Sequence, residues 1–212
     1  MQVSKSRRLS LEALLTALAV ILNLTISFPA PYLTYLTYEV WEVPIVLALL
    51  MLGLRSGVTV AVLNSIVLEL VKPQALPTGP LYNLAAIVAM FVGILAAQRV
   101  AKRRGWGVVT LLAISTSLGV ITRTSIMTVV NAIVLPLPYP IGFGSFGVTV
   151  SQLPVLLPLI GFFNFTVALY TIPLAHSIQK AIATRYRLTL STPGPLRVCD
   201  ESESSPSSFS GV

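Results

Sequence analysis

Six apolar runs, separated by short polar or Pro/Gly-rich connections, dominate the hydrophobic pattern of this chain. An α-helix rises about 1.5 Å per residue and a bilayer core is about 30 Å thick, so about 20 apolar residues cross it. The second and third runs are shorter than the others. The pattern therefore predicts an all-α membrane protein, a six-transmembrane-helix bundle with short helices 2 and 3. The runs cover residues 9–28, 43–54, 58–71, 81–97, 106–135 and 153–178.

Composition and charge support a membrane protein. Hydrophobic residues make up 55% of the chain and charged residues 10%, against about a quarter charged in soluble domains. The 14 Lys and Arg residues lie almost entirely between the runs, so they indicate membrane orientation, and no nucleic-acid partner is expected. With the N-terminus inside, Arg55, the cluster at 99–104 and Lys180 fall in the cytoplasm, and Lys72 falls outside. We therefore expect a multi-pass cell-membrane protein with cytoplasmic N- and C-termini.

The runs leave no room for a separate soluble domain. Residues 1–188 are therefore predicted to form one transmembrane domain, whose first helix ends at Pro29 and Pro31. Residues 189–212 are rich in Pro, Ser and acidic residues and have little apolar surface to bury, which predicts a disordered cytoplasmic tail.

The two short runs predict a helical hairpin with a tight turn at residues 55–57. Short segments interrupted by glycine often lie at the binding region of transporters. Glu69 lies inside the third run and is the candidate ion-pair partner of Arg123 in the fifth. Extension of the second run backward through Trp41 would make it an ordinary span, and this alternative stays open.

The fifth run carries polar side chains at membrane depth. An arginine there costs about 2.5–3.5 kcal/mol on insertion scales, so Arg123 is expected to face the bundle interior or a wet cavity. Ser117, Thr124 and Asn131 are spaced by seven, with Thr128 one turn beyond Thr124, so they share a helix face. This face either contacts a ligand or cavity, or forms a structural hydrogen-bond seam between helices.

Aromatic and amide side chains gather toward the outer side of the predicted bundle. Tyr35, Tyr38 and Glu39 follow the first run and form either an interfacial aromatic belt or a lid over a planar ligand. Asn83 begins the fourth run on the same side, and Asn164 lies in the last run. Amides donate and accept hydrogen bonds and rings stack, so a neutral, partly aromatic ligand is favoured.

The sequence lacks the motifs of several common enzymatic activities. There is no Gly-x-x-x-x-Gly-Lys-Ser/Thr phosphate loop and no Gly-x-Ser-x-Gly nucleophile elbow, so we expect neither ATP hydrolysis nor another enzymatic activity. One cysteine and one histidine predict no metal site, and no cofactor is expected. Ala13 and Ala17, four residues apart, form a small-xxx-small surface that would let another helix approach closely.

The order of these features resembles the substrate-binding S component of energy-coupling factor (ECF) vitamin transporters, and within them the riboflavin-binding group. The resemblance extends to about residue 185, and its specificity comes from the order of loose motifs. The matching stretches are Tyr35-Leu-Thr-Tyr-Glu-Val-Trp-Glu-Val-Pro44, Leu-Gly-Leu-Arg-Ser-Gly57, Pro77-Thr-Gly-Pro80 before Asn83, Asn131-Ala-Ile-Val-Leu-Pro136 and Phe163-Asn164.

The resemblance implies six helices, with the ligand in the outer half under the first loop and with Asn131 and Asn164 hydrogen-bonded to a flavin. Ala13 and Ala17 would correspond to the surface that docks on a membrane T component, which two cytosolic ATPases drive. One position departs from the pattern: a lysine often follows the helix-six asparagine by three residues, and here Val167 stands there. Arg123 either supplies a compensating donor or only pairs with Glu69.

The leading hypothesis is therefore a substrate-binding subunit that captures riboflavin outside the cell and delivers it with an ATP-driven partner module. The alternatives are an S component for another vitamin or precursor, a self-sufficient carrier coupled through Glu69 and Arg123, and a structural membrane protein. The candidate substrate-binding residues are Tyr35, Tyr38, Glu39, Asn83, Arg123, Thr128, Asn131 and Asn164.

Overall fold

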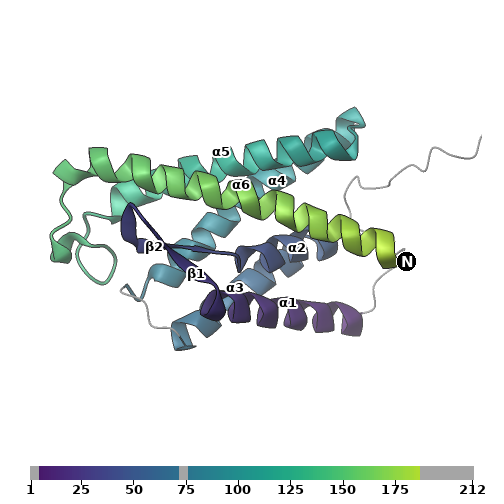
Figure 1. The fold of residues 1–212 in the computed structure, drawn as a ribbon, viewed down its shortest axis with the longest axis horizontal. Coiled ribbons are helices and arrows are strands. Elements are labelled where there is room, and N and C mark those ends of the chain that lie inside the picture. Colours follow the sequence, from purple (N-terminus) through teal and green to yellow (C-terminus); the bar gives the residue numbers. More distant parts are fainter. Residues whose placement is uncertain (1–4, 72–75, 187–212) are drawn as a thin grey trace, which may run out of the picture.

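The computed structural model describes residues 5–71 and 76–186, except for the side chains of residues 34, 35, 185 and 186. The tail predicted for residues 189–212 lies outside the described residues. The described chain is a bundle of helices with a small β-hairpin (Figure 1). Its elements are α1 (Lys5–Thr25), β1 (Ser27–Ala30), β2 (Leu33–Glu39), α2 (Glu42–Leu52), α3 (Leu54–Val71), α4 (Gly79–Arg104), α5 (Val108–Val134), η1 (Gly144–Phe146), η2 (Val150–Gln152) and α6 (Leu153–Tyr186).

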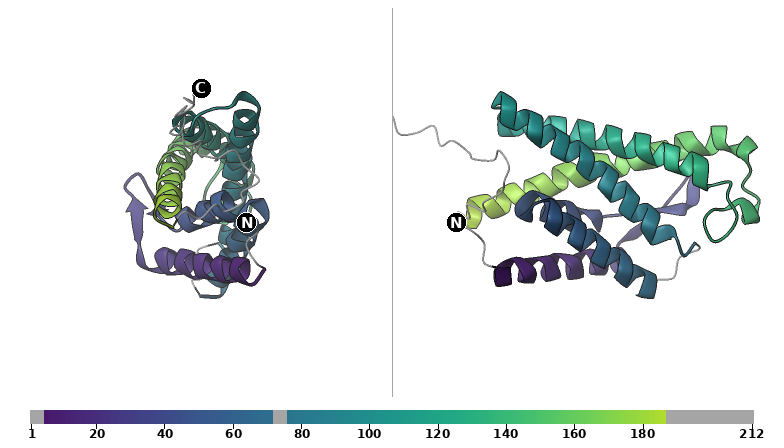
Figure 2. Two further views of the ribbon diagram at one scale, coloured as in Figure 1. Left: turned by 90° about the vertical axis from the view of Figure 1, so that its right-hand side faces the viewer. Right: turned by 180° about the vertical axis from the view of Figure 1, so that it is seen from behind.

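The short helix α2 forms the centre of the bundle. Residues 42–51 are all buried, because α2 packs against α3, α6 and α1. The longer helices α4, α5 and α6 pack side by side, with α5 between the other two (Figure 2). Five of the described helices are long and apolar enough to cross a membrane, whereas α2 has 11 residues. The prediction of a helical membrane bundle with a short second helix is confirmed.

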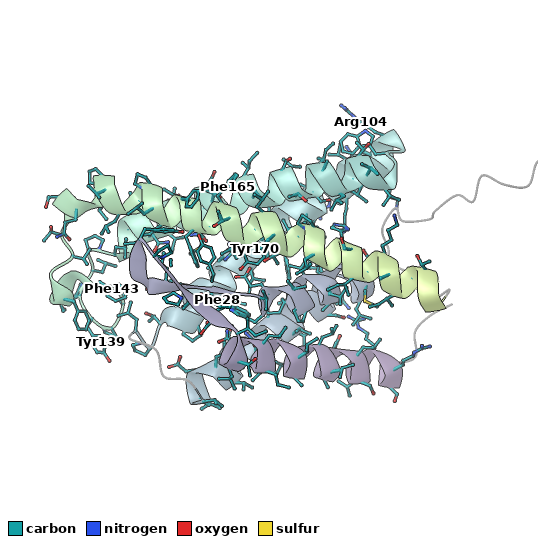
Figure 3. The ribbon with its side chains drawn as sticks, viewed as in Figure 1. Phe28, Arg104, Tyr139, Phe143, Phe165 and Tyr170 are labelled. Carbon is teal, nitrogen blue, oxygen red and sulfur yellow. The ribbon has the colours of Figure 1, made fainter. Side chains whose placement is uncertain are left out.

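The two ends of the bundle differ in chemistry. The start of α1 and the ends of α4 and α6 lie at one end, and the β-hairpin and the α5–α6 connection lie toward the other (Figure 1). Arg104 lies at the first end, and Tyr139 and Phe143 lie at the opposite end (Figure 3). The last turn of α4 carries Lys102, Arg103 and Arg104. Basic residues are therefore gathered at one end, as the positive-inside rule requires of a membrane bundle.

The all-α fold class needs one correction, because residues predicted as helix and loop form a β-hairpin. Helix α1 ends at Thr25, and β1 then pairs antiparallel with β2, with Phe28 opposite Tyr38. Pro29 cannot donate the backbone hydrogen bond that a helix needs there. The following Tyr, Thr and Leu residues suit a strand, since aromatic and β-branched side chains pack well on a pleated surface.

The junction between α2 and α3 also differs from the prediction. The chain turns at Gly53, whose φ of 93° lies in the left-handed region that favours glycine, rather than at residues 55–57. Helix α3 therefore begins at Leu54 and has 18 residues, so the third helix is not short. Gly57 lies inside α3, where a Cβ would stand 3.0 Å from the Leu49 Cβ, so its role is close packing against α2.

Close packing between α4 and α5 at Gly93 gives a test of the fold. A Cβ at Gly93 would stand 2.4 Å from the Leu118 carbonyl oxygen. Because that oxygen belongs to a helix backbone, Gly93→Ala is expected to lower the free energy of unfolding by about 1–3 kcal/mol. Thermal unfolding of the purified protein in detergent measures the loss. Gly107→Ala is the control, since nothing lies within 4 Å of its added Cβ; equal effects of the two changes would contradict the helix packing.

Candidate functional site

A buried ion pair joins α5 to α2. Arg123 Nη2 donates to Glu42 Oε1 at 2.8 Å, and Nη1 donates to the other carboxylate oxygen. Their side chains are only 4% and 5% exposed. Two parallel hydrogen bonds of this kind fix orientation as well as distance. The arginine at membrane depth is therefore neutralised inside the bundle, as its sequence position predicts.

The pair extends to α6 through Asn164. Arg123 Nε donates to Asn164 Oδ1 at 3.1 Å, and Asn164 Nδ2 donates to the Ile160 carbonyl at 3.0 Å. Glu42 is the first residue of α2, where the positive end of the helix dipole favours a carboxylate. We call Glu42, Arg123 and Asn164 the polar cluster; it connects three helices at one point.

The sequence assigned the wrong partner to Arg123. Glu69 is exposed near the end of α3, and the carboxylate that pairs with Arg123 belongs to Glu42. The predicted second run begins at residue 43, which left Glu42 outside the helix. The alternative that extends the second helix back through Trp41 would have placed Glu42 inside the bundle, so the signal was present.

The β-hairpin is attached to α6 next to the polar cluster. The Tyr38 and Thr166 hydroxyls lie 2.9 Å apart, within hydrogen-bond distance. The Tyr170 hydroxyl donates to the main-chain carbonyl of Glu39 at 2.5 Å, and Trp41 Nε1 donates to the Glu39 carboxylate at 2.6 Å. Tyr170 lies near the middle of α6 beside the hairpin (Figure 3). Tyr38 and Glu39, both candidate site residues, thus lie at the boundary between the hairpin and α6.

Aromatic rings from both elements pack at this boundary. The Tyr38 and Phe163 ring centroids are 4.9 Å apart, and those of Tyr32 and Phe162 are 5.8 Å apart with an edge-to-face geometry. The Tyr32 and Tyr38 hydroxyls hydrogen-bond to each other. Desolvation and then the Tyr38 hydroxyl raise the pKa of Tyr32, so its phenol is neutral at physiological pH. The hairpin therefore presents uncharged rings and hydroxyls to α6.

Asn131 and Thr128 lie farther along α5 than the polar cluster. Asn131 Nδ2 donates to the Met127 carbonyl, and the Thr128 hydroxyl donates to the Thr124 carbonyl, both at 2.7 Å. Eight residues separate Arg123 from Asn131, which is about 12 Å along a helix axis. The structure thus unites Arg123 with Asn164 and leaves Asn131 hydrogen-bonded within its own helix.

The remaining predicted site residues have different surroundings. Asn83 is half-buried near the start of α4. The backbone of Tyr35 lies in β2, and its side chain lies outside the described part of the structure. Ala13 and Ala17 are exposed on the α1 surface of the bundle, and neither belongs to the polar cluster.

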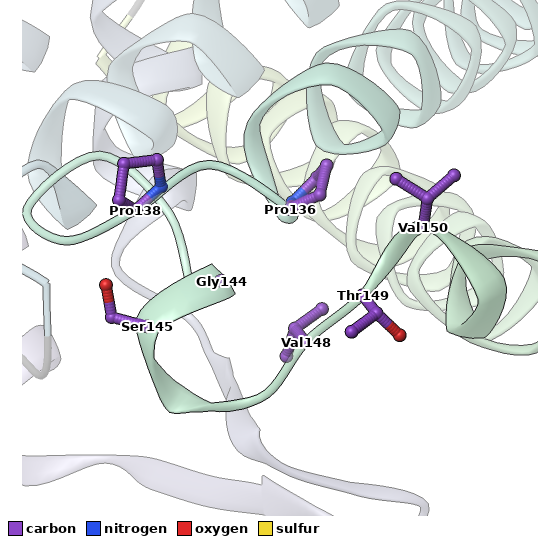
Figure 4. Close-up of a pocket in the computed structure, with 7 residues that line it drawn as sticks. All are labelled: Pro136, Pro138, Gly144, Ser145, Val148, Thr149 and Val150. Atoms are coloured by element: carbon purple, nitrogen blue, oxygen red, sulfur yellow. The ribbon is translucent and has the colours of Figure 1, made fainter.

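A separate pocket lies in the connection between α5 and α6 (Figure 4). Its volume is about 470 Å³. Hydrogen bonds tie this connection to α4: Thr78 Oγ1 donates to the Pro140 carbonyl at 2.9 Å, and the Tyr82 hydroxyl to the Ile141 carbonyl at 2.6 Å. Since it contains no member of the polar cluster, the pocket is distinct from the candidate site. It is lined by Pro136, Pro138, Gly144, Ser145, Val148, Thr149 and Val150.

The chemistry of the candidate site is that of binding. The charges of Arg123 and Glu42 cancel, and the neighbouring groups are amides, phenols and an indole that hydrogen-bond or stack, together with the Glu39 carboxylate, which accepts from the Trp41 indole. In the described residues, no three His, Cys, Asp or Glu side chains are grouped to hold a metal ion. The arrangement can orient a neutral molecule with a ring system.

No protein-family model and no curated protein sequence matches the chain. Among solved structures, it is similar to the S component of a bacterial ECF transporter, with 22% sequence identity and a TM-score of 0.68. The match covers 87% of this chain and 100% of that one. The chain therefore has the fold of an ECF S component, a multi-pass membrane bundle.

The ion pair makes a direct prediction about stability. Arg123→Met leaves the Glu42 carboxylate buried and unpaired, so we expect the free energy of unfolding to fall by about 3–5 kcal/mol. The double change Arg123→Met with Glu42→Met removes both charges and should recover most of this loss. Thermal unfolding in detergent of the natural protein, the single variants Arg123→Met and Glu42→Met and the double variant gives the coupling between the two positions. Glu69→Gln is the control and should change stability by less than about 0.5 kcal/mol. Additive effects at positions 123 and 42 would contradict the pairing.

Proposed function

We propose that this chain is the membrane-embedded substrate-binding subunit of an ECF-type vitamin importer, and that it captures riboflavin from outside the cell. The observation that carries the proposal is the polar cluster, which lies beside an aromatic hairpin within the fold of an S component. A structural protein needs hydrogen bonds between helices, but it has no need of a hairpin of uncharged rings placed over them.

The balance of charge at the site supports a flavin-like substrate. Because the Arg123–Glu42 pair has no net charge, the polar cluster itself offers no excess charge to attract an ion. Riboflavin is neutral, and the edge of its ring system carries hydrogen-bond donors and acceptors that match amides and a guanidinium. Tyr38 and Phe163 supply the flat surfaces on which a ring can stack.

ATP-driven partners would supply the energy for uptake. The chain has no phosphate-binding loop, so we assign ATP hydrolysis to two cytosolic ATPase subunits that act through a membrane T component. The exposed Ala13 and Ala17 lie on either side of the middle of α1, where a close helix contact is possible. We place the basic end of the bundle, with both termini, in the cytoplasm, and the hairpin on the outside.

A self-sufficient carrier is the second candidate, and the buried ion pair is the observation that favours it. Such a carrier needs an ionisable group inside the bundle, and Glu42 is one. Uptake of riboflavin by liposomes that contain this chain alone, abolished by Glu42→Gln, would favour the carrier over the ECF subunit. No uptake without the partner subunits supports the ECF subunit.

Substitution of Asn131 tests substrate binding without disturbing the ion pair. The resemblance to riboflavin-binding S components implies that Asn131, half-buried on α5, hydrogen-bonds the flavin, so we expect Asn131→Leu to lower riboflavin affinity about 10- to 100-fold, the cost of that hydrogen bond. Quenching of flavin fluorescence by the purified protein measures the dissociation constant. Ser117→Leu, at an exposed position of the same helix, is the matched control and should leave affinity unchanged.

The outcomes of this experiment separate the hypotheses. Protein that is purified yellow, or that binds added riboflavin, supports the proposed substrate. Folded natural protein that does neither refutes riboflavin as the ligand. Loss of folding in Asn131→Leu, without any ligand bound by the natural protein, would assign Asn131 to helix packing.

Substitution on α1 tests the docking surface. Ala13→Trp and Ala17→Trp place a bulky ring where a partner helix would approach, so we expect co-purification of the co-expressed T component and ATPases to fall at least about tenfold. Riboflavin binding by the isolated subunit should persist. Ile121→Trp, at a position 58% exposed on α5, is the control. Unchanged co-purification in both alanine variants would assign the α1 surface to lipid.

A further inference from the structure

Asn64 is a polar side chain with no partner at the centre of the bundle. It lies on α3 and is 0% exposed. Neither its amide nitrogen nor its carbonyl oxygen has a hydrogen-bond partner. A buried amide left in this state destabilises a protein, and most buried polar groups in native structures are satisfied. An asparagine at this position therefore needs a functional explanation.

The register of the α2–α3 hairpin places Asn64 at the level of Glu42. Gly57 of α3 packs against Leu49 of α2. Asn64 follows Gly57 by seven residues and Glu42 precedes Leu49 by seven, and the two helices are joined at Gly53. Seven residues are close to two helical turns, so each residue lies about 10 Å from the Gly57–Leu49 contact on the same stripe of its helix.

Glu42 has unused capacity for hydrogen bonds on that stripe. An ionised carboxylate offers about four lone-pair directions, and the two hydrogen bonds from Arg123 occupy two of them. Asn64 carries two N–H donors, both without an acceptor. When Arg123 is the only strong donor to Glu42, any group that draws Arg123 away leaves a buried carboxylate unpaired, which is costly.

We propose that Asn64 is a positioning residue, a reserve hydrogen-bond donor to the Glu42 carboxylate when Arg123 turns toward substrate. The Asn64 amide then donates to one Glu42 carboxylate oxygen in place of Arg123. The Arg123 guanidinium can therefore bind a substrate carbonyl without leaving the buried Glu42 carboxylate unpaired. The part that concerns substrate rests on the proposed function. The proposed hydrogen bond from Asn64 to Glu42 does not depend on that function, and it can be tested without any ligand.

The first experiment is a double-mutant cycle on the full-length protein in detergent. Arg123→Lys keeps the charge but has one amine in place of a forked guanidinium, so it frees a Glu42 oxygen. We expect Asn64→Leu to leave the midpoint of thermal unfolding unchanged or raised in the natural background, because it removes an unpartnered amide. In the Arg123→Lys background it should lower the midpoint by about 3–10 °C, the range for one hydrogen bond to a charged group in a chain of this size.

Ser115→Ala is the matched control. Ser115 also has a buried hydroxyl without a partner, on α5 two turns from Arg123. Its loss should shift the midpoint equally in the two backgrounds. Arg123→Gln replaces Arg123→Lys if the latter does not fold, and Asn64→Ser, which keeps a donor, should show a smaller coupling than Asn64→Leu. Equal shifts for Asn64→Leu in both backgrounds would overturn the proposal. This is the result expected if an internal water, and not Glu42, satisfies the Asn64 amide.

The second experiment measures riboflavin affinity in the natural background. Asn64→Leu is expected to weaken binding about tenfold or more while the unfolding temperature without ligand holds or rises, a combination that a purely structural residue would not give. Ser115→Ala should leave affinity unchanged. If the natural protein does not bind riboflavin, the proposed substrate fails, and the thermal cycle still decides whether Asn64 supports Glu42. Unchanged affinity in Asn64→Leu, with riboflavin bound by the natural protein, would overturn the role in binding.

Discussion

The need to neutralise one arginine inside an apolar bundle sets the geometry of this protein. A guanidinium at membrane depth is tolerated when a carboxylate meets it with two good hydrogen bonds, and Glu42 is that carboxylate. The pair fixes the first turn of α2 against α5, and the further bond to Asn164 fixes both against α6. The apolar contacts of α2 are non-directional, so several arrangements of the helices could bury the same apolar surface. The polar cluster selects one of these arrangements.

The position of the hairpin follows from the position of the ion pair. Glu39 ends β2 and Glu42 begins α2, so few residues separate the strand from the buried charge. Trp41 between them is buried and donates its indole N–H back to Glu39. A shift of the hairpin against α6 is therefore transmitted directly to the start of α2. The hairpin and the ion pair are mechanically linked through these residues.

The sequence predicts the helices well where their apolar runs are long. The fifth run and α5 agree within two residues at each end, because period and length both favour a span there.

The prediction fails where contacts between distant residues determine the local structure. Residues 27–39 form paired strands only because each supplies the other's hydrogen bonds, and Gly53, not Gly57, makes the turn because Gly57 is needed for close packing on Leu49. At the site, the cost of a charge at membrane depth assigned Arg123 to the interior, but its partner could not be found by spacing, since Glu42 is 81 residues away.

The short length of α2 has a consequence for how the hairpin end of the bundle is built. Eleven residues rise about 16 Å, roughly half of a bilayer core, so the hairpin occupies the column that a full helix would fill. Each strand of a two-stranded sheet has one edge whose amides and carbonyls are not used in pairing. The Glu39 carbonyl, which accepts from Tyr170, shows that main-chain atoms of the hairpin also make hydrogen bonds outside the sheet. Contacts made by these main-chain atoms do not depend on side-chain identity, so replacement of a hairpin side chain cannot delete them.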